Sequence, residues 1–304
     1  MAQSTDTTPR APLILSGQPV AEAVYAGLRP RIESLARAGH PPGLGTILVG
    51  NDPASAGYIR MKQQRAAELA IHSPHQQLPA TATQADLVAA IRAFNDADEV
   101  DAMLVQHPIP RGLDYGAALL EMDPDKDVDG LHPLNLGRLT LGIPGPIPCT
   151  PAGIEALLAH YQIPLAGREV VILGRGTTLG RPLALLLSQK RPTANAAVTV
   201  LHTAVADWPR YTRRAEIVVA AVGVPGILQP QHVRQGAVMI SGGVRYQGRR
   251  VLPDVDERCA EVAGAITPRL GGVGPTTVAM LLRNVVEAAE RRLETSHHRP
   301  PAMT

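Results

Sequence analysis

The chain has 304 residues, 45% of them hydrophobic, and a formal net charge of +2. This length allows one large α/β domain or two smaller ones, and the near-neutral charge without a Lys/Arg block excludes the usual nucleic-acid-binding surface. No run reaches the roughly 18 apolar residues of a membrane span, and the polar N-terminus lacks the apolar stretch of a signal peptide. Cys149 and Cys259 are too few for a disulfide framework and indicate a reducing compartment. We therefore expect a cytoplasmic protein that binds neither membrane nor nucleic acid, with disordered tails at residues 1–11 and 296–304.

Helical and strand patterns alternate along the first half of the chain. Apolar residues recur at helical spacing in some segments, and short apolar runs bounded by turn residues lie between them. The predicted order is helix, strand, helix, helix and strand over residues 20–35, 45–49, 58–69, 87–94 and 102–105. This rhythm predicts a small, parallel-type sheet with helices.

A stretch crowded with Pro and Gly, residues 123–151, separates this half from a second α/β pattern. The stretch predicts a hinge or the lining of a cleft. After a helix that begins near Pro151, strands are predicted at 169–173, 197–201 and 217–221 and helices at 180–187 and 276–292. The economical interpretation is two α/β domains joined by this connector.

A glycine-rich loop follows the first strand of the second half. Val170–Leu173 leads into Gly174-Arg175-Gly176-Thr177-Thr178-Leu179-Gly180, and a helix follows. Glycines at such a turn let a pyrophosphate approach the free N–H groups of the helix N-terminus. Turns use glycine everywhere, but the strand–glycine–helix context predicts a dinucleotide site.

The end of the next strand favours NADP over NAD as the dinucleotide. An acid there would bind the ribose diol of NAD, but the strand ends at His202-Thr203 and the next acid is Asp207. Arg175, in the glycine loop, could instead contact a ribose phosphate. The alternative is that His202 is a surface residue and Arg175 is merely solvated.

Tyr58 and Lys62 form a pair at helical i, i+4 spacing, which places both side chains on one face. Lysine acts as an acid or base when desolvation lowers its pKa, and tyrosine stacks on rings and donates a proton. Short-chain dehydrogenases use this pair downstream of their glycine loop; here it lies far upstream, which argues against that class. Gln106 leaves the carboxyl end of the strand at 102–105, where open α/β sheets place ligands, although an ordinary loop is the alternative.

Asp125, Asp127 and Asp129 alternate before Gly130 and resemble a calcium loop. The twelfth position counted from Asp125 is Leu136, where such a loop needs Glu, so no metal site is expected. One of the carboxylates suits recognition of an amino-substituted heterocycle through paired hydrogen bonds. A solvated capping cluster is the interpretation for the other two.

Taken in order, these segments resemble the methylenetetrahydrofolate dehydrogenase/methenyltetrahydrofolate cyclohydrolase family. Each segment is modest evidence, but the ordered set is specific. The matching segments are Pro53-Ala54-Ser55 with Tyr58 and Lys62, Val105-Gln106 with Pro108 and Pro110, Pro124–Gly130, His132-Pro133 with Asn135, Gly137 and Arg138, Pro148–Pro151 with Gly153, the glycine loop with Arg181-Pro182, Ala221–Gly223 with Pro225-Gly226, and Gly271–Pro275.

The resemblance implies a two-domain α/β fold around a cleft. A folate-binding catalytic domain would comprise 12–148 with 276–295, and a Rossmann-type NADP-binding domain would comprise 149–275. The activity would be that of a bifunctional oxidoreductase and hydrolase of one-carbon metabolism. It would oxidise 5,10-methylenetetrahydrofolate with NADP and hydrolyse the methenyl product to 10-formyltetrahydrofolate. A homodimer is also implied.

The resemblance also implies a role for individual residues. Lys62 would be the acid and base of the hydrolytic step with Gln106 tuning it, Tyr58 would stack on the folate, and Asp129 would bind the amino-pyrimidine edge of the pterin. Gly271, Gly272 and Pro275 would line the substrate site. The cofactor would be bound by Gly174, Arg175, Gly176, Gly180, His202, Thr203, Gly223 and Gly243.

Several positions depart from the family pattern. They are His107 after the Gln, Gly176 in place of Ser, Ser241-Gly242 in place of Asp-Val, Leu270 in place of Pro, and Thr276 in place of Met. These departures leave two alternatives open. One is a dehydrogenase with weak or lost cyclohydrolase activity, in which His107 disturbs the Lys62–Gln106 pair. The other is a protein that binds folate and NADP without turnover.

Overall fold

In the computed structural model, the described residues, 11–248 and 250–297, divide into two compact α/β units. One contains the described residues up to Val20 with Thr150–Thr276, and the other contains Ala21–Cys149 with the described residues from Thr277 onward. The predicted α/β fold class with two domains is confirmed, whereas the predicted domain bounds and the cleft stay predictions. The predicted tails fall on residues outside the described ones, apart from residues 11, 296 and 297.

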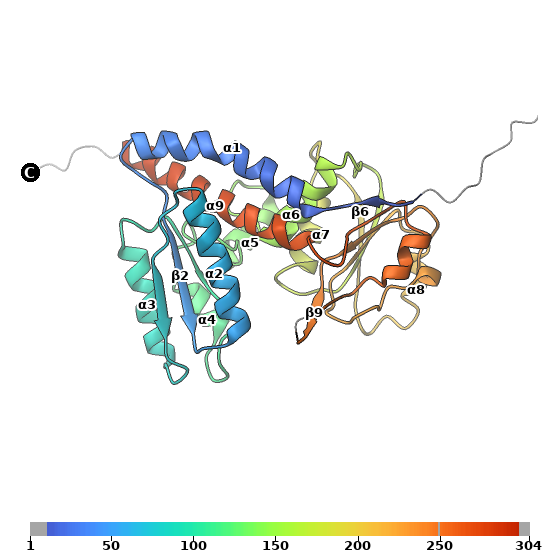
Figure 1. Cartoon of the computed structure of the whole chain (residues 1–304), viewed down its shortest axis with the longest axis horizontal. Coiled ribbons are helices and arrows are strands. Elements are labelled where there is room, and N and C mark those ends of the chain that lie inside the picture. The colour runs from blue at the N-terminus through green and yellow to red at the C-terminus, as the bar shows by residue number, and fades with distance from the viewer. Residues whose placement is uncertain (1–10, 249, 298–304) are drawn as a thin grey trace, which may run out of the picture. The chain divides into compact units, whose positions relative to one another are not determined.

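The unit that contains Ala21–Cys149 has a small parallel sheet in the order β3-β2-β4 among its described residues. Figure 1 shows α2 and α3 lying along strand β2. The strands are β2 (Leu44–Val49), β3 (His75–Leu78) and β4 (Ala102–Val105). The helices are α2 (Pro53–Glu68), α3 (Gln84–Asp96), α4 (Tyr115–Leu120) and α5 (Pro133–Leu141), with most of α1 (Gly17–Arg37) and α9 (Val273–His297).

The other unit has a larger parallel sheet in the order β1-β11-β8-β7-β5-β6 among its described residues. Its strands are β1 (Leu13–Ile14), β5 (Glu169–Leu173), β6 (Ala197–Leu201), β7 (Ile217–Ala220), β8 (Val238–Ser241) and β11 (Ala265–Ile266). Strands β9 (Val244–Gln247) and β10 (Arg250–Pro253) pair as an antiparallel ladder. The helices are α6 (Cys149–His160), α7 (Gly180–Leu187) and α8 (Pro209–Thr212), with 3₁₀ helices η1 (Pro230–His232) and η2 (Glu257–Glu261).

Strand β5 is apolar from Val170 to Leu173 because both faces of the larger sheet are covered there. Val170 and Ile172 pack into one hydrophobic cluster, while Val171 and Leu173 pack into another. Successive side chains of a strand point to opposite faces, so a strand between two hydrophobic clusters is apolar on both faces. This explains the apolar run that follows Glu169 in the sequence.

Helix α5 lies inside the Pro- and Gly-rich stretch at 123–151, where the sequence analysis predicted no helix. His132 caps its N-terminus by accepting a hydrogen bond from Leu134 N at 3.1 Å, and Pro133 occupies the first turn. Gly142 ends it with φ of 68°, a left-handed conformation that glycine adopts without strain. Among the described residues, the structure has no helix that is both long and apolar enough to cross a membrane.

Candidate active site

Helix α2 positions Tyr58 and Lys62, as the i, i+4 spacing predicts. The helix begins because Asp52 accepts a hydrogen bond from Ser55 N at 2.8 Å and Pro53 fits the first turn. Tyr58 is 38% exposed, and Lys62 is half-buried one turn further along. The two side chains therefore lie on the same face of α2, with the Tyr58 ring at the surface and the Lys62 side chain more deeply buried.

Gln106 contacts Lys62 from the carboxyl end of β4. Lys62 Nζ donates a hydrogen bond to Gln106 Oε1 at 3.1 Å, and the buried Gln106 side chain donates from Nε2 to the backbone oxygen of His107 at 2.7 Å. A carbonyl can only accept, so the His107 carbonyl holds the amide with its oxygen toward the ammonium. The structure thus brings together two residues that lie 44 positions apart in the sequence.

Asp129 reaches the same edge of the small sheet on a segment that runs beside β4. Asp127 forms a parallel bridge with Met103 of β4, and Asp129 follows two residues later. Burial raises the pKa of the Asp129 carboxyl; the Lys62 ammonium lowers this pKa and the Asp127 carboxylate raises it. The Lys62 ammonium therefore favours the charged form of the Asp129 carboxyl, against the effect of burial.

Tyr115 and Cys149 are further residues near Asp129 that the sequence analysis did not assign to the site. Burial raises the pKa of both, and the negative charge of Asp129 raises it further. Tyr115 also packs its ring edge-on against His107, with centroids 5.2 Å apart. Tyr115 begins the short helix α4 and carries no pattern that singles it out, whereas Cys149 lies in the Pro148–Pro151 segment that the resemblance covers.

The other two aspartates of the alternating segment differ from each other. Asp125 is exposed and pairs with Arg138 at 2.9 Å, as a solvated cluster predicts. For Asp127 that prediction is wrong, because the residue is buried and accepts hydrogen bonds from His132 N at 2.7 Å and Asn135 Nδ2 at 2.9 Å. Asp127 therefore ties the segment to the start of α5.

In the larger sheet, the predicted cofactor-binding residues follow the carboxyl ends of neighbouring parallel strands. Parallel strands end at a common edge, and open α/β sheets bind ligands there. The loops after β5, β6, β7 and β8 carry, respectively, Gly174 to Gly180, His202 with Thr203, Gly223, and Gly243. The topology therefore gathers at one edge residues that span about 70 positions of the sequence.

The glycine loop requires its first and last glycines. Gly174 has φ of 114°, and an added Cβ would lie 2.3 Å from the oxygen of Ala221. A Cβ on Gly180 would lie 2.2 Å from the oxygen of Gly174, so the loop closes directly on the start of α7. A Cβ added to Gly176 would have no atom within 4 Å apart from its chain neighbours, so a serine would fit there without displacing the chain. The departure at this position therefore changes chemistry and not backbone shape.

Asp254 and Ser241 hold the loops after β7 and β8. The buried Asp254 carboxylate accepts hydrogen bonds from Val222 N at 2.7 Å and Gly223 N at 2.9 Å. Ser241 Oγ donates to Gly243 O and accepts from Asp254 N, both at 3.0 Å. The serine that departs from the family pattern thus has a structural use: it links the Gly243 loop to Asp254.

Arg175, His202 and Thr203 follow the carboxyl ends of β5 and β6. Arg175 and Thr203 are exposed, and His202 is half-buried with Nδ1 accepting a hydrogen bond from Ala204 N at 3.3 Å. Further along the same unit, Gly271 O accepts a hydrogen bond from Gly17 N at 2.7 Å, next to Gly272 and ahead of Pro275 in α9. Leu270, which departs from the family pattern, is 63% exposed, so its side chain adds little to the core.

Two family profiles match this chain. The profile described as "Tetrahydrofolate dehydrogenase/cyclohydrolase, catalytic domain" matches residues 15–129, and the "NAD(P)-binding domain" profile of the same name matches residues 148–293. "Bifunctional protein FolD 1" of Salinispora tropica is 65% identical over 277 residues, which cover 91% of this chain and 90% of that protein. The chain belongs to the tetrahydrofolate dehydrogenase/cyclohydrolase family.

Solved structures of family members have the same fold. The bifunctional enzyme FolD-methylenetetrahydrofolate dehydrogenase/cyclohydrolase of Campylobacter jejuni matches with a TM-score of 0.89 at 36% identity, over 93% of this chain and 100% of that one. The methylenetetrahydrofolate dehydrogenase-cyclohydrolase of Trypanosoma brucei, solved with NADP cofactor and an inhibitor, matches with a TM-score of 0.87 at 34% identity. That match covers 93% of this chain and 99% of the trypanosomal one. The resemblance stated from the sequence is thereby confirmed.

Proposed function

We propose that this family member oxidises 5,10-methylenetetrahydrofolate with NADP and hydrolyses the resulting methenyl compound to 10-formyltetrahydrofolate. The observation that carries the proposal is the contact of Lys62 with Gln106 at 3.1 Å, beside the raised-pKa carboxyl of Asp129. A protein that only binds folate has no use for an ammonium positioned in this way. Named bifunctional relatives with high identity support the same activity.

Asp129, Tyr58 and Lys62 bind and act on the folate in this proposal. The Asp129 carboxylate accepts paired hydrogen bonds from the amino-pyrimidine edge of the pterin, and the exposed Tyr58 ring stacks on the substrate. Hydride loss from the methylene bridge needs alignment more than an acid or base, because the two nitrogens stabilise the cation that forms. Hydration of that cation does need proton transfer: the neutral amine form of Lys62 takes up a proton from the attacking water, and the ammonium so formed gives it to the ring nitrogen that leaves when the ring opens.

The carboxyl edge of the larger sheet fits NADP. Gly174 and Gly180 let the glycine loop close on the start of α7, and Arg175 in the same loop presents an exposed guanidinium. When bound, the nicotinamide ring supplies the hydride acceptor. The loops held by Asp254 fix Gly223 and Gly243 next to this position. From the family resemblance alone, we also propose that Gly271, Gly272 and Pro275 bind substrate.

Arg175 sets the preference for NADP over NAD in this proposal. We expect Arg175→Ala to raise KM for NADP about 10–150-fold, because a hydrogen bond to a charged group contributes about 1.5–3 kcal/mol and each 1.4 kcal/mol is tenfold. KM for NAD should change less than about threefold, since NAD lacks the phosphate that the guanidinium would bind. Initial rates with each dinucleotide check this, with Arg181→Ala as the matched control. Equal losses for both dinucleotides would contradict the assignment.

His107 does not prevent the Lys62–Gln106 contact, although it departs from the family pattern. The His107 ring packs against Tyr115. Only the backbone oxygen of His107 contacts Gln106, and a residue of any type supplies that oxygen. We therefore expect His107→Leu to leave the rate of methenyltetrahydrofolate hydrolysis within about threefold, below the 10²-fold scale of a lost acid–base group. A tenfold or larger gain would favour the alternative in which His107 weakens the cyclohydrolase.

The proposed function is tested by supplying each substrate separately to the purified protein. Methylenetetrahydrofolate with NADP, and in parallel with NAD, gives the dehydrogenase rate from the appearance of reduced nicotinamide. Methenyltetrahydrofolate without any nucleotide gives the cyclohydrolase rate. We expect both rates to exceed the uncatalysed ones, and NADP to be preferred. Binding of both ligands without either reaction would establish the alternative of a protein without turnover.

We further propose that the protein is a cytoplasmic homodimer that serves one-carbon metabolism. The family resemblance supports the homodimer. The two cysteines, which are free and buried, support a reducing compartment such as the cytoplasm. Sedimentation equilibrium of the purified chain tests the homodimer. A single species with the 32.2 kDa mass of one chain would contradict it.

A further inference from the structure

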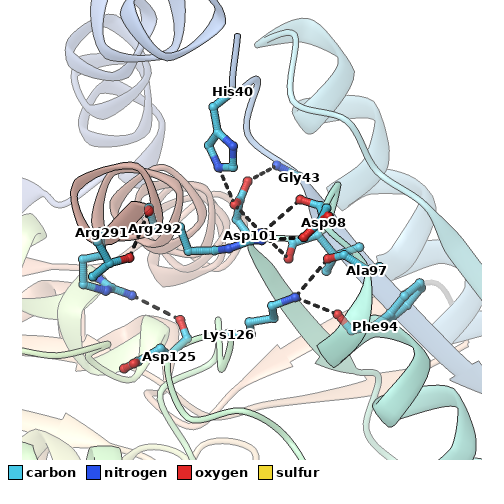
Figure 2. A network of polar contacts seen from close by, with 12 residues as sticks. His40, Gly43, Phe94, Ala97, Asp98, Asp101, Asp125, Lys126, Arg291 and Arg292 are labelled. Atoms are coloured by element: carbon cyan, nitrogen blue, oxygen red, sulfur yellow. Dashed lines mark hydrogen bonds and ion pairs between the residues drawn. The ribbon is translucent and has the colours of Figure 1, made fainter. Parts of the chain in front are cut away.

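Lys126 is a buried lysine whose ammonium contacts the C-terminal end of helix α3. It is 5% exposed, and its Nζ donates hydrogen bonds to the backbone oxygens of Phe94, Asn95 and Ala97 at 2.9, 2.7 and 3.0 Å. Figure 2 shows the ammonium pointing at this end of the helix. The last carbonyls of a helix lack intrahelical partners and carry partial negative charge, so an ammonium with three donors satisfies them and is satisfied in turn.

The backbone of Lys126 is fixed to β4 by a separate set of hydrogen bonds. Met103 N donates to Lys126 O at 2.7 Å, and Val128 N donates to Met103 O at 3.2 Å. Strand β4 ends next to Gln106, and the segment from Lys126 ends at Asp129. Because the two run parallel, a shift of the Lys126 segment along β4 would move Asp129 relative to Gln106.

The α3–β4 connection has a second cation that remains when Lys126 is replaced. Arg292 donates to the backbone oxygens of Asp98 and Val100 at 3.0 and 3.1 Å, and to the Asp101 carboxylate at 2.9 Å. Asp101 is also bound by His40 and by Gly43 N, as Figure 2 shows. Loss of the Lys126 ammonium therefore removes the side-chain contacts between the end of α3 and the segment that leads to Asp129, while the backbone hydrogen bonds of that segment to β4 and the Arg292 contacts stay in place.

We propose that Lys126 is a positioning residue for the folate site, which acts by fixing the segment that carries Asp129. This inference rests on the proposed function, in which Asp129 binds the pterin. Lys126 touches neither substrate nor cofactor in this account. Its effect passes through Asp129 and changes folate affinity, whereas the cofactor loops, on the other unit, do not depend on it.

The experiment compares Lys126→Met, Lys126→Arg, Asp129→Asn and the Lys126→Met/Asp129→Asn double variant. Arg31→Met is the control, since it breaks the Arg31–Glu290 pair in the same unit and touches none of the residues above. Each protein is titrated with tetrahydrofolate, and KM is measured for methylenetetrahydrofolate and for NADP. Thermal unfolding of every variant shows how much stability each substitution removes.

We expect Lys126→Met to raise the tetrahydrofolate Kd and the methylenetetrahydrofolate KM about tenfold, with KM for NADP unchanged, on the scale of coupled neighbouring residues. Lys126→Arg should restore most of the affinity because its guanidinium also donates to carbonyls. In the Asp129→Asn background, Lys126→Met should add less than about twofold, because its route of action is already removed.

Three results would overturn the inference alone. Equal Kd values for wild type and Lys126→Met would do so, as would full additivity in the double variant. The same loss of folate affinity in Arg31→Met at matched stability would show that the effect is general destabilisation. A wild-type protein that binds no tetrahydrofolate would overturn the proposed function and this inference with it, whereas binding by wild type and Lys126→Met alike overturns the inference alone.

Discussion

Lys62→Met is expected to slow the hydrolysis of methenyltetrahydrofolate about 10²–10⁴-fold, the typical contribution of a positioned acid–base group. Met keeps most of the volume of the side chain but can neither accept nor donate the proton. Gln106 Oε1 then loses the hydrogen bond that it accepts from Lys62 Nζ at 3.1 Å. Oxidation of methylenetetrahydrofolate should fall by less than about tenfold, because that step depends on alignment and not on proton transfer.

Lys190→Met is the matched control for this substitution. Lys190 is an exposed lysine between α7 and β6 on the other unit, so it shares the residue type and not the site. Both rates of this variant should equal those of the wild type. If Lys62→Met slowed both steps equally, Lys62 would be a binding residue and not the acid and base of the second step.

Asp129→Asn is expected to weaken folate binding and to stabilise the fold at neutral pH. An amide cannot accept paired hydrogen bonds from the pterin edge, and loss of one charge-assisted bond of about 1.5–3 kcal/mol raises KM about 10–150-fold. Burial raises the pKa of Asp129, which means that the folded chain disfavours its charged form. Removing that charge therefore raises the free energy of unfolding at pH 7.

The pH dependence of this stabilisation follows from the direction of the shift. Because the folded-state pKa lies above the unfolded one, the wild type loses stability as pH rises through the raised folded pKa and regains it as pH falls. The advantage of Asp129→Asn should thus shrink on acidification and vanish below the unfolded value of about 3.9. Chemical denaturation of both proteins between neutral and acid pH measures it, with the exposed Asp125→Asn as control. A variant less stable than wild type at pH 7 would contradict the desolvation account.

Local sequence patterns predicted several elements at their observed positions. The strands at 102–105, 169–173 and 197–201 and the helix at 180–187 lie where they were predicted, because short apolar runs and helical spacing of apolar residues are typical of elements that pack on a core. The first two strands are buried, whereas the strand at 197–201 is a half-buried edge strand. Strand β3 (His75–Leu78) was not predicted. Its sequence is His-Gln-Gln-Leu at the edge of the small sheet, and an edge strand need not be apolar.

The candidate site was predictable where one residue type suggests one chemistry, as at Lys62, Gln106 and the glycine loop. The residues that surround these positions were not predictable, since their places depend on contacts between segments that lie far apart in the sequence. Tyr115 reaches Asp129 only because α4 packs nearby, and Asp127 and Lys126 are buried although a run of charged residues ordinarily indicates a solvated segment. Their partners lie at the end of α3 and the start of α5, which no local pattern reveals.

The most direct test of bifunctionality is one time course with methylenetetrahydrofolate and NADP, in which NADPH and methenyltetrahydrofolate are recorded together. If one chain catalyses both steps, NADPH exceeds the methenyl compound from early in the reaction, and the difference appears as 10-formyltetrahydrofolate. The Lys62→Met protein run alongside should instead accumulate the methenyl compound. If the wild type formed NADPH and methenyltetrahydrofolate in equal amounts throughout, the chain would be a dehydrogenase alone and the role given to Lys62 would be wrong.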